Sequence, residues 1–156
     1  NFLSLMPTNL YGPNDNYDLE NSHVLAAFIR KFHEAKQSGK SVVLWGDGSP
    51  RREFLHSYDL AEAIIFLLEN KNASDIGEII NVGTGADITI RELAELVASI
   101  IGYTGEVVWD TTRPNGTPQK LLDVSRIMNM GWKSKIALQD GIKNTYTDFL
   151  SHFVNQ

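Results

Sequence analysis

The fold of this chain is decided by residues 78–101, EIINVGTGADITIRELAELVASII. The first part, Glu78 to Val82, is an apolar run of strand length that ends at the turn Gly83-Thr84-Gly85. Thr89 and Glu92 then form the pattern of a capping box, followed by apolar residues spaced three and four apart, which is typical of an amphipathic helix. A strand followed directly by a capped helix is the repeating unit of α/β proteins. The stretch therefore predicts an α/β fold.

Strand-like and helical segments alternate along the rest of the chain. Strands are expected at residues 2–6, 41–45 and 106–109, and helices at residues 22–38, 59–70, 123–130 and 138–153. The candidate helix caps are Asn21 or Ser22, Asp59 with Glu62, and Asp123. Residues 7–21 are dense in Pro, Gly, Asn and Asp and are predicted to be a long exposed loop. No internal repeat interrupts this order, so one domain is expected.

The composition excludes several classes of function. With 42% hydrophobic and 21% charged residues, the chain is ordinary for a soluble globular domain. A formal charge of −5 disfavours a nucleic-acid partner, because phosphate backbones are bound by concentrated Lys and Arg. The absence of cysteine excludes a disulfide framework, a thiolate metal site and a cysteine nucleophile within these residues. No apolar run or leader indicates a membrane or secretion, so a cytoplasmic protein is expected.

The beginning of the chain indicates that it belongs to something longer. The sequence opens with Asn1 and enters a predicted buried strand at Phe2, without any lead-in. We therefore expect an excised part of a larger protein. The alternative is a processed protein with a natural start at this residue.

Three polar loops are rich in groups that bind anions or donate hydrogen bonds, and predicted scaffold elements separate them. The loops are residues 7–23, 45–56 and 110–120. Arg51 and Arg52, with Arg30, Lys31 and Lys120 from elsewhere, are candidates for a diphosphate clamp, because guanidinium and ammonium groups bind phosphate oxygens. The alternative is a solvated charged surface, which is the commoner role of such residues. We expect the three loops to converge on one site.

The aromatic and imidazole candidates each have two interpretations. Trp45 ends a predicted strand and is either a stacking platform for a nucleobase or part of the core, with the core favoured by pattern alone. His23 and His56 are either proton donors and acceptors or residues that cap and pack helices. The sequence pattern alone favours packing for both histidines.

Two motifs are rejected as ligand sites. Asp15, Asp18 and Glu20 lack the glycine and the terminal glutamate of a calcium loop, so no metal is expected. Gly83-x-Gly85 follows a strand, but Ile88 stands where the dinucleotide fingerprint requires a third glycine. The glycine turn is therefore not expected to be a cofactor loop.

Three longer segments carry a resemblance to a known superfamily. Residues 7–13, PTNLYGP, resemble the segment that follows the catalytic Tyr-x-x-x-Lys in extended short-chain dehydrogenases, which have a Rossmann-like NAD(P)-binding fold. Residues 52–61, with REFLH and DLA, resemble a second segment of these enzymes, and residues 81–93 resemble a third. The likeness implies the superfamily but leaves the substrate open.

A narrower resemblance covers almost the whole chain. The residues that carry it are Asp15-Asn16, Asn21-Ser22-His23-Val24, Lys31-Phe32-His33-Glu34-Ala35, Val43-Leu44-Trp45-Gly46, Gly116-Thr117-Pro118 and Lys120-Leu121-Leu122-Asp123. Together they resemble the GDP-L-fucose synthase family. Two departures are Ala26, where relatives commonly have Pro, and Lys31, where some have Arg; Lys31 offers a point charge in place of a bidentate fork.

The resemblance implies a division of labour between two domains. Members of the family bind NADP(H) on an N-terminal Rossmann domain and the GDP-sugar mainly on a C-terminal domain. Residues 1–156 resemble the C-terminal nucleotide-sugar-binding part, with one or two strands that would complete the sheet of the absent N-terminal domain. Such strands would leave exposed edges that favour association. By resemblance, a homodimer is expected at full length.

The resemblance also assigns residues and an activity. The nicotinamide side would be lined by Pro7, Thr8, Asn9, Leu10 and His23, and the GDP-sugar would be held by Asn9, Val24, Lys31, Trp45, Arg52, Asn115 and Lys120. His23 would be the catalytic acid. The implied reaction is the NADPH-dependent conversion of GDP-4-keto-6-deoxy-D-mannose to GDP-L-fucose by 3,5-epimerisation and 4-keto reduction, and this part alone would be inactive. The alternatives are another nucleotide-sugar epimerase or dehydratase, and a non-catalytic nucleotide-sugar-binding module.

Overall fold

The computed structural model describes residues 2–77 and 79–154 and has the predicted mixed α/β character. The strands are Ser4–Pro7 (β1), Asn9–Tyr11 (β2), Val42–Trp45 (β3), Arg51–Arg52 (β4), Phe54–His56 (β5), Ile79–Val82 (β6), Ile88–Thr89 (β7), Val107–Asp110 (β8) and Gln119–Lys120 (β9). The helices are Val24–Ser38 (α1), Ser57–Asn70 (α2), Ala73–Ile76 (α3), Ile90–Ile101 (α4), Ser125–Asn129 (α5) and Leu138–Phe149 (α6), followed by a π-helical turn, Leu150–Val154. Asn1 and Glu78, which the sequence interpretation used, lie outside the described residues.

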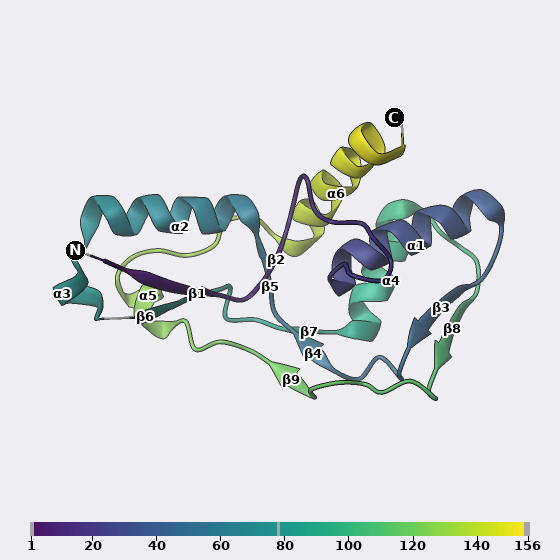
Figure 1. Ribbon diagram of the computed structural model, residues 1–156, viewed down its shortest axis with the longest axis horizontal. Helices are drawn as coiled ribbons and strands as arrows, with labels where there is room; N and C mark the ends of the chain where they lie inside the picture. The colour runs from purple at the N-terminus through teal and green to yellow at the C-terminus, as the bar shows by residue number, and fades with distance from the viewer. Residues whose placement is uncertain (1, 78, 155–156) are drawn as a thin grey trace.

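The elements form an elongated molecule with two lobes (Figure 1). Parallel strands β1 and β6 lie in one lobe with α2, α3 and α5, and parallel strands β3 and β8 lie in the other with α1 and α4. Between them run the parallel pair β2 and β5 and the three-stranded group β7, β4 and β9. The short strands between the lobes carry most of the polar loops identified in the sequence.

The lobe built on α1 and α4 has a core set by helical spacing. Leu25, Ile29 and Phe32 of α1 and Leu93 and Val97 of α4 are all at most 1% exposed. The predicted capping box of α4 is confirmed, because the Thr89 hydroxyl accepts from the Glu92 amide at 3.0 Å and the Glu92 carboxylate accepts from the Thr89 amide at 2.9 Å. Local sequence therefore determines where α4 begins.

The other predicted caps are wrong. Helix α1 is preceded by His23, whose side chain makes no capping hydrogen bond, rather than by a capping Asn21 or Ser22. Helix α2 is capped by His56, whose Nδ1 accepts from the Tyr58 amide at 3.2 Å, while Asp59 is buried inside the first turn. The residue before α5 is Val124, and Asp123 instead bonds the Ser125 amide.

The predicted exposed loop at residues 7–21 is partly wrong as well. Asn9–Tyr11 pairs in parallel with Phe54–His56, so the loop begins with a strand. Tyr11 and Tyr17 are buried, at 3% and 5% exposure. Partners distant in sequence cover these residues, and the Pro, Gly and Asn content of the segment gives no sign of them.

The lobe built on β1 and β6 has a second core and several exposed apolar side chains. Leu67 of α2, Ile80 and Val82 of β6 and Ile127 of α5 are at most 1% exposed. The opposite face of the strand pair exposes Met6 and Ile79, and α2 exposes Tyr58, Ile65 and Leu68. Among the described residues, β1 pairs with β6 alone. We call this exposed set, Met6, Tyr58, Ile65, Leu68 and Ile79, the open surface.

His33 makes the stability of the α1 lobe depend on pH. Its imidazole is 7% exposed and its Nδ1 lies 3.0 Å from the Tyr146 hydroxyl. Burial lowers the pKa of His33, Lys36 acts in the same direction, and Glu34 opposes them. The pKa of His33 in the folded protein lies below its unfolded value of about 6.5. The contribution of the neutral imidazole to the unfolding free energy is therefore fully present above pH ~6.5. It is lost as the pH falls below that value, because the unfolded state then binds a proton more readily than the folded state.

We therefore expect the unfolding free energy to fall between pH 7 and pH 5, and His33→Gln to make that fall shallower. The difference in slope is at most ~1.4 kcal/mol per pH unit, the value for one proton. Urea unfolding of both proteins at several pH values measures it. His56, whose pKa burial also lowers, is present in both proteins and cancels in the comparison. Parallel pH profiles for the two proteins would contradict the prediction.

Candidate functional site

The predicted site residues line two pockets. The cationic pocket, about 320 Å³ in volume, is lined by Leu19, Glu20, Ser22, Val24, Ala27, Phe28, Lys31, Trp45, Arg52, Ile90, Pro114 and Asn115. The His23 pocket is lined by Pro7, Thr8, Asn9, Leu10, His23, Lys120, Leu121 and Leu122. Val24 lines the cationic pocket, and His23, the residue before it, lines the His23 pocket. Arg52 of the cationic pocket is also paired with Lys120 of the His23 pocket, across strands β4 and β9. The two pockets therefore adjoin.

The cationic pocket is built from one face of α1 and the ends of short strands. Val24, Ala27 and Lys31 recur at three- and four-residue steps and so lie on the same side of the helix. The Lys31 ammonium donates to the Val43 carbonyl at 3.3 Å, and burial lowers its pKa. Asn115 reaches in from the third loop, where its Oδ1 accepts from the Asp47 amide at 2.8 Å. The loop after β3 and the loop that carries Asn115 are thus tied together at the pocket.

Trp45 is a surface residue, so its interpretation as core is wrong. Its side chain is 64% exposed at the end of β3. The Lys31 ammonium lies 6.0 Å from the ring centroid and the Arg113 guanidinium carbon 5.2 Å from it. An exposed indole flanked by two cations has the chemistry to stack on an aromatic base and to balance a nearby negative charge. Arg113 was not predicted, because a single arginine in a polar loop gives no signal of its position.

The candidate clamp separates into residues that face the pockets and residues that do not. Arg52, Lys31 and Lys120 line them. Arg51 bonds Asp87 at 2.7 Å, and Arg30 bonds Glu34 at 2.7 Å. The candidate cations that face the pockets are therefore Lys31 of α1, Arg52 of β4 and Lys120 of β9.

The His23 pocket joins an exposed imidazole to a polar wall. His23 has extended backbone at the start of α1 and makes no side-chain cap bond, so the capping interpretation of this residue is wrong. Thr8 and Asn9 are fixed because the Thr8 hydroxyl and the Asn9 amide donate to the Glu53 carbonyl at 3.2 and 2.7 Å. Burial raises the pKa of the Asp15 carboxyl, and the hydrogen bond from the Asn16 amide opposes that rise. This pocket can deliver a proton beside oriented hydrogen-bonding groups.

His56, the other candidate imidazole, is a packing residue. It is 1% exposed, caps α2 and lies between the rings of Tyr11 and Tyr58, with centroid distances of 5.2 and 5.0 Å. Burial lowers its pKa, which favours the neutral ring, and Asp59 opposes that shift. It lines neither pocket, as the packing interpretation predicted.

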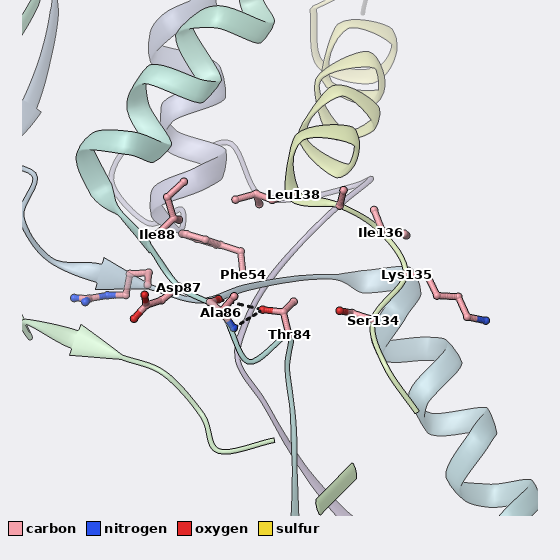
Figure 2. A pocket seen from close by; sticks show the side chains of 11 residues that line it. Phe54, Thr84, Ala86, Asp87, Ile88, Ser134, Lys135, Ile136 and Leu138 are labelled. Atoms are coloured by element: carbon pink, nitrogen blue, oxygen red, sulfur yellow. Dashed lines mark hydrogen bonds between the residues drawn. The ribbon is translucent and has the colours of Figure 1, made fainter. Parts of the chain in front are cut away.

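A third hollow shares Arg52 with the cationic pocket and is otherwise lined mostly by apolar or already bonded side chains (Figure 2). Phe54, Ile88 and Leu138 provide apolar walls, and Lys135 points away from the hollow in Figure 2. Asp87 at its edge already accepts from Arg51 and Gln119, and Lys135 pairs with Glu62. The candidate site therefore remains with the other two pockets.

The described ranges 2–77 and 79–154 contain no cluster of three His, Cys, Asp or Glu side chains able to hold a metal ion. In the same ranges, no helix is both long and apolar enough to cross a membrane. Asp18, one of the acidic residues considered above, instead accepts from the amides of Glu20 and Asn21.

Parallel strands alternating with helices define an α/β protein, and its candidate site gathers cations, an exposed indole and an imidazole. Residues 1–83 match the model of the NAD dependent epimerase/dehydratase family, which is more than half of the chain. The chain belongs to this family.

Individual proteins of known name show to which members of the family this chain is similar. The chain is 53% identical to the probable GDP-L-fucose synthase 1 of Oryza sativa subsp. japonica over 98% of this chain and 46% of that protein. It is 49% identical to the GDP-L-fucose synthase of Escherichia coli (strain K12), over 97% of this chain and 49% of that protein. A GDP-L-fucose synthetase from Naegleria fowleri bound to NADP superposes with a TM-score of 0.88 at 27% identity, over 99% of this chain and 48% of that chain. The resemblance predicted from the motifs is confirmed, and the chain spans about half the length of the curated relatives it matches.

Proposed function

We propose that this chain supplies the GDP-sugar-binding part and the epimerisation acid of an NADPH-dependent enzyme that converts GDP-4-keto-6-deoxy-D-mannose to GDP-L-fucose. The observation that carries the proposal is the position of the predicted residues, which come from separate segments of the chain and all line the two adjoining pockets. The similarity to GDP-L-fucose synthases supports the choice of substrate.

The cationic pocket is proposed to hold the nucleotide diphosphate. Arg52, Lys31 and Lys120 carry positive charge toward the pockets, and a diphosphate is the part of a nucleotide-sugar that needs it. Trp45 is exposed beside Lys31 and is proposed to stack on the base. Val24, Asn9 and Asn115 are proposed to complete the contacts with the GDP-sugar. The sugar is then expected to extend from the cationic pocket toward the His23 pocket.

His23 is proposed to return protons to the sugar ring. The 4-keto group acidifies the carbons on either side, so both can lose a proton to give an enolate and regain it on the opposite face. An exposed imidazole that lines the pocket is placed to donate that proton. Thr8 and Asn9, fixed through Glu53, orient the polar wall beside it.

NADPH, when bound, supplies the hydride for reduction of the 4-keto group. Pro7, Thr8, Asn9, Leu10 and His23 share one pocket and are proposed to line its nicotinamide side. Gly83 and Gly85 do not provide a phosphate-binding loop, because a Cβ on Gly83 would overlap the Glu53 carboxylate, which fills the space beside the turn. Most cofactor contacts are therefore proposed to come from an N-terminal domain outside residues 1–156.

The open surface is proposed to be covered by that N-terminal domain. Met6 and Ile79 are 51% and 49% exposed on a strand pair whose other face is packed, a pattern expected for strands inside a larger parallel sheet. The full-length protein is proposed to be a cytoplasmic homodimer that binds neither nucleic acid nor membrane. Sedimentation of the full-length protein as a monomer would contradict the dimer.

We expect the full-length protein to form GDP-L-fucose from GDP-4-keto-6-deoxymannose with oxidation of NADPH, and residues 1–156 alone to oxidise none. The isolated chain is also expected to self-associate, because the open surface has no cover. Product chromatography, absorbance of NADPH and sedimentation make the three measurements. Failure of the full-length protein to form the product, or turnover by the isolated chain, contradicts the proposed function. A compact monomer would contradict only the proposed role of the open surface.

A further inference from the structure

Glu53 is a buried carboxylate that joins two loops through backbone hydrogen bonds. The residue is 0% exposed and lies between β4 and β5. Its Oε1 accepts from the amides of Thr84 and Gly85 at 2.6 and 2.8 Å. Its Oε2 accepts from the Leu122 amide at 3.0 Å. Each carboxylate oxygen therefore holds a different segment of the chain.

The backbone of Glu53 holds both walls of the His23 pocket. Its carbonyl accepts from the side chains of Thr8 and Asn9, and its amide donates to the Lys120 carbonyl at 3.3 Å. Thr8 and Asn9 form one wall, and Lys120 and Leu122 form another. One residue thus connects three segments that are far apart in the sequence.

The segment that carries Asn115 and Lys120 has little packing to fix it. All residues from 111 to 121 are exposed. Backbone bonds from Arg51 to Pro118 and from Glu53 to Lys120 attach it to β4, and the Leu122 amide is fixed by the Glu53 carboxylate. A segment without buried side chains depends on such hydrogen bonds for its position.

We propose that Glu53 is a positioning residue: its amide holds the Lys120 carbonyl and its carboxylate holds the Leu122 amide, so that Lys120 faces the same diphosphate as Arg52. Glu53 is buried and acts through Lys120 without touching the ligand itself. The proposal rests on the proposed binding of GDP at this site. The site would then include Glu53, which does not contact the ligand but places Lys120, which does.

Glu53→Gln removes one part of this arrangement while keeping the size of the side chain. The amide oxygen can still accept from Thr84 and Gly85, but the NH₂ group then faces the Leu122 amide, and two donors cannot bond each other. The change therefore removes the side-chain bond to the Leu122 amide and leaves the backbone bond from the Glu53 amide to the Lys120 carbonyl in place. We expect it to weaken GDP binding about tenfold, because the chain that follows Lys120 is then fixed on one side only and the ammonium is placed less precisely.

Asp59→Asn is the matched control. Asp59 is 2% exposed, and its two oxygens accept from the amides of Lys135 and Ile136 at 3.1 Å, so it is also a buried carboxylate that holds a loop. It lines neither pocket of the site. Urea unfolding is expected to show a loss of stability in both variants, whereas GDP titration of the full-length protein is expected to weaken only in Glu53→Gln.

A double-mutant cycle separates positioning from general damage. Lys120→Met alone is expected to weaken GDP binding about ten- to hundredfold, and adding Glu53→Gln to it less than about twofold further, because the ammonium that Glu53 places is already gone. Independent losses that multiply, or unchanged GDP affinity in Glu53→Gln, would overturn the inference. An unaltered protein that does not bind GDP would instead contradict the proposed function.

Amide exchange decides the structural step without any variant or ligand. In the unaltered protein the Leu122 amide is expected to be protected, although the preceding segment is exposed. Exchange of the Leu122 amide as fast as the amides of residues 111–117 would overturn the inference, whatever the protein binds.

Discussion

Replacement of His23 by Gln in the full-length protein is expected to slow 3,5-epimerisation by about 10²–10⁴-fold, the usual contribution of a general acid. The glutamine side chain keeps a hydrogen-bonding group at the start of α1 but has no proton to give. Direct reduction of the unepimerised ketone is expected to survive at least in part, because the hydride does not pass through His23. Incorporation of deuterium from D₂O at C3 and C5 of the sugar measures the first step, and NADPH oxidation measures the second.

His152→Gln is the control for this experiment. His152 is an exposed histidine in the π-helical turn after α6, paired with Asp148 at 2.9 Å, and it lines neither pocket. Its replacement is expected to leave both rates unchanged. Full retention of both activities in His23→Gln would remove His23 from the mechanism and favour a 4-epimerase or dehydratase, which shares most of the motifs but does not need this acid. Loss of all activity and all binding of both ligands would indicate that His23 supports the fold.

Local patterns in the sequence were sufficient for the helices that define the fold. The capping box at Thr89 and Glu92 and the apolar spacing after it contain their own partners within one turn, so α4 begins where predicted. Helix α3, Ala73–Ile76, was not predicted, because a single turn has no apolar period to detect. The pairing of Asn9–Tyr11 with Phe54–His56 was missed for another reason. Its partners lie far apart in the chain, and no local pattern specifies them.

Strand periodicity would have corrected two errors at the site. In β3, Val42 and Leu44 are buried and Trp45 is exposed, as the alternation of side chains along a strand requires. Arg51 and Arg52 are consecutive in β4 and therefore point to opposite faces, so only one of them can face a given pocket. The prediction of Trp45 as core and the grouping of both arginines ignored this period of two.

Glu53 shows what sequence reasoning could not supply. A carboxylate at a buried strand position appears unfavourable until its partners are known, because burying an unpaired charge is costly. Those partners are amides of Thr84, Gly85 and Leu122, which come from two distant segments. Every residue except proline has a backbone amide, so no pattern in the sequence marks the three amides that bond Glu53.

The combined change Arg52→Ala and Lys120→Met is expected to weaken GDP binding by about 10²–10⁴-fold. Each substitution removes a cation that lines the proposed diphosphate site. A hydrogen bond to a charged group contributes ~1.5–3 kcal/mol, so the loss of two such bonds gives a change of this size. The two sites are register partners on β4 and β9, so their effects are expected to be coupled rather than strictly additive. Calorimetric titration of the full-length protein with GDP, UDP and dTDP measures the loss.

The neighbouring arginine provides the matched control. Arg51 carries the same charge on the same strand, but its guanidinium is bonded to Asp87 and lines neither pocket. Arg51→Ala is therefore expected to change GDP affinity by no more than about threefold, the scale of a partly exposed ion pair. The diphosphate is common to the three nucleotides, so loss of Arg52 and Lys120 should weaken all of them alike, and any preference for GDP must come from the Trp45 side of the pocket. Equal losses in Arg51→Ala and Arg52→Ala would show that the net charge of the surface, rather than a built clamp, attracts the ligand.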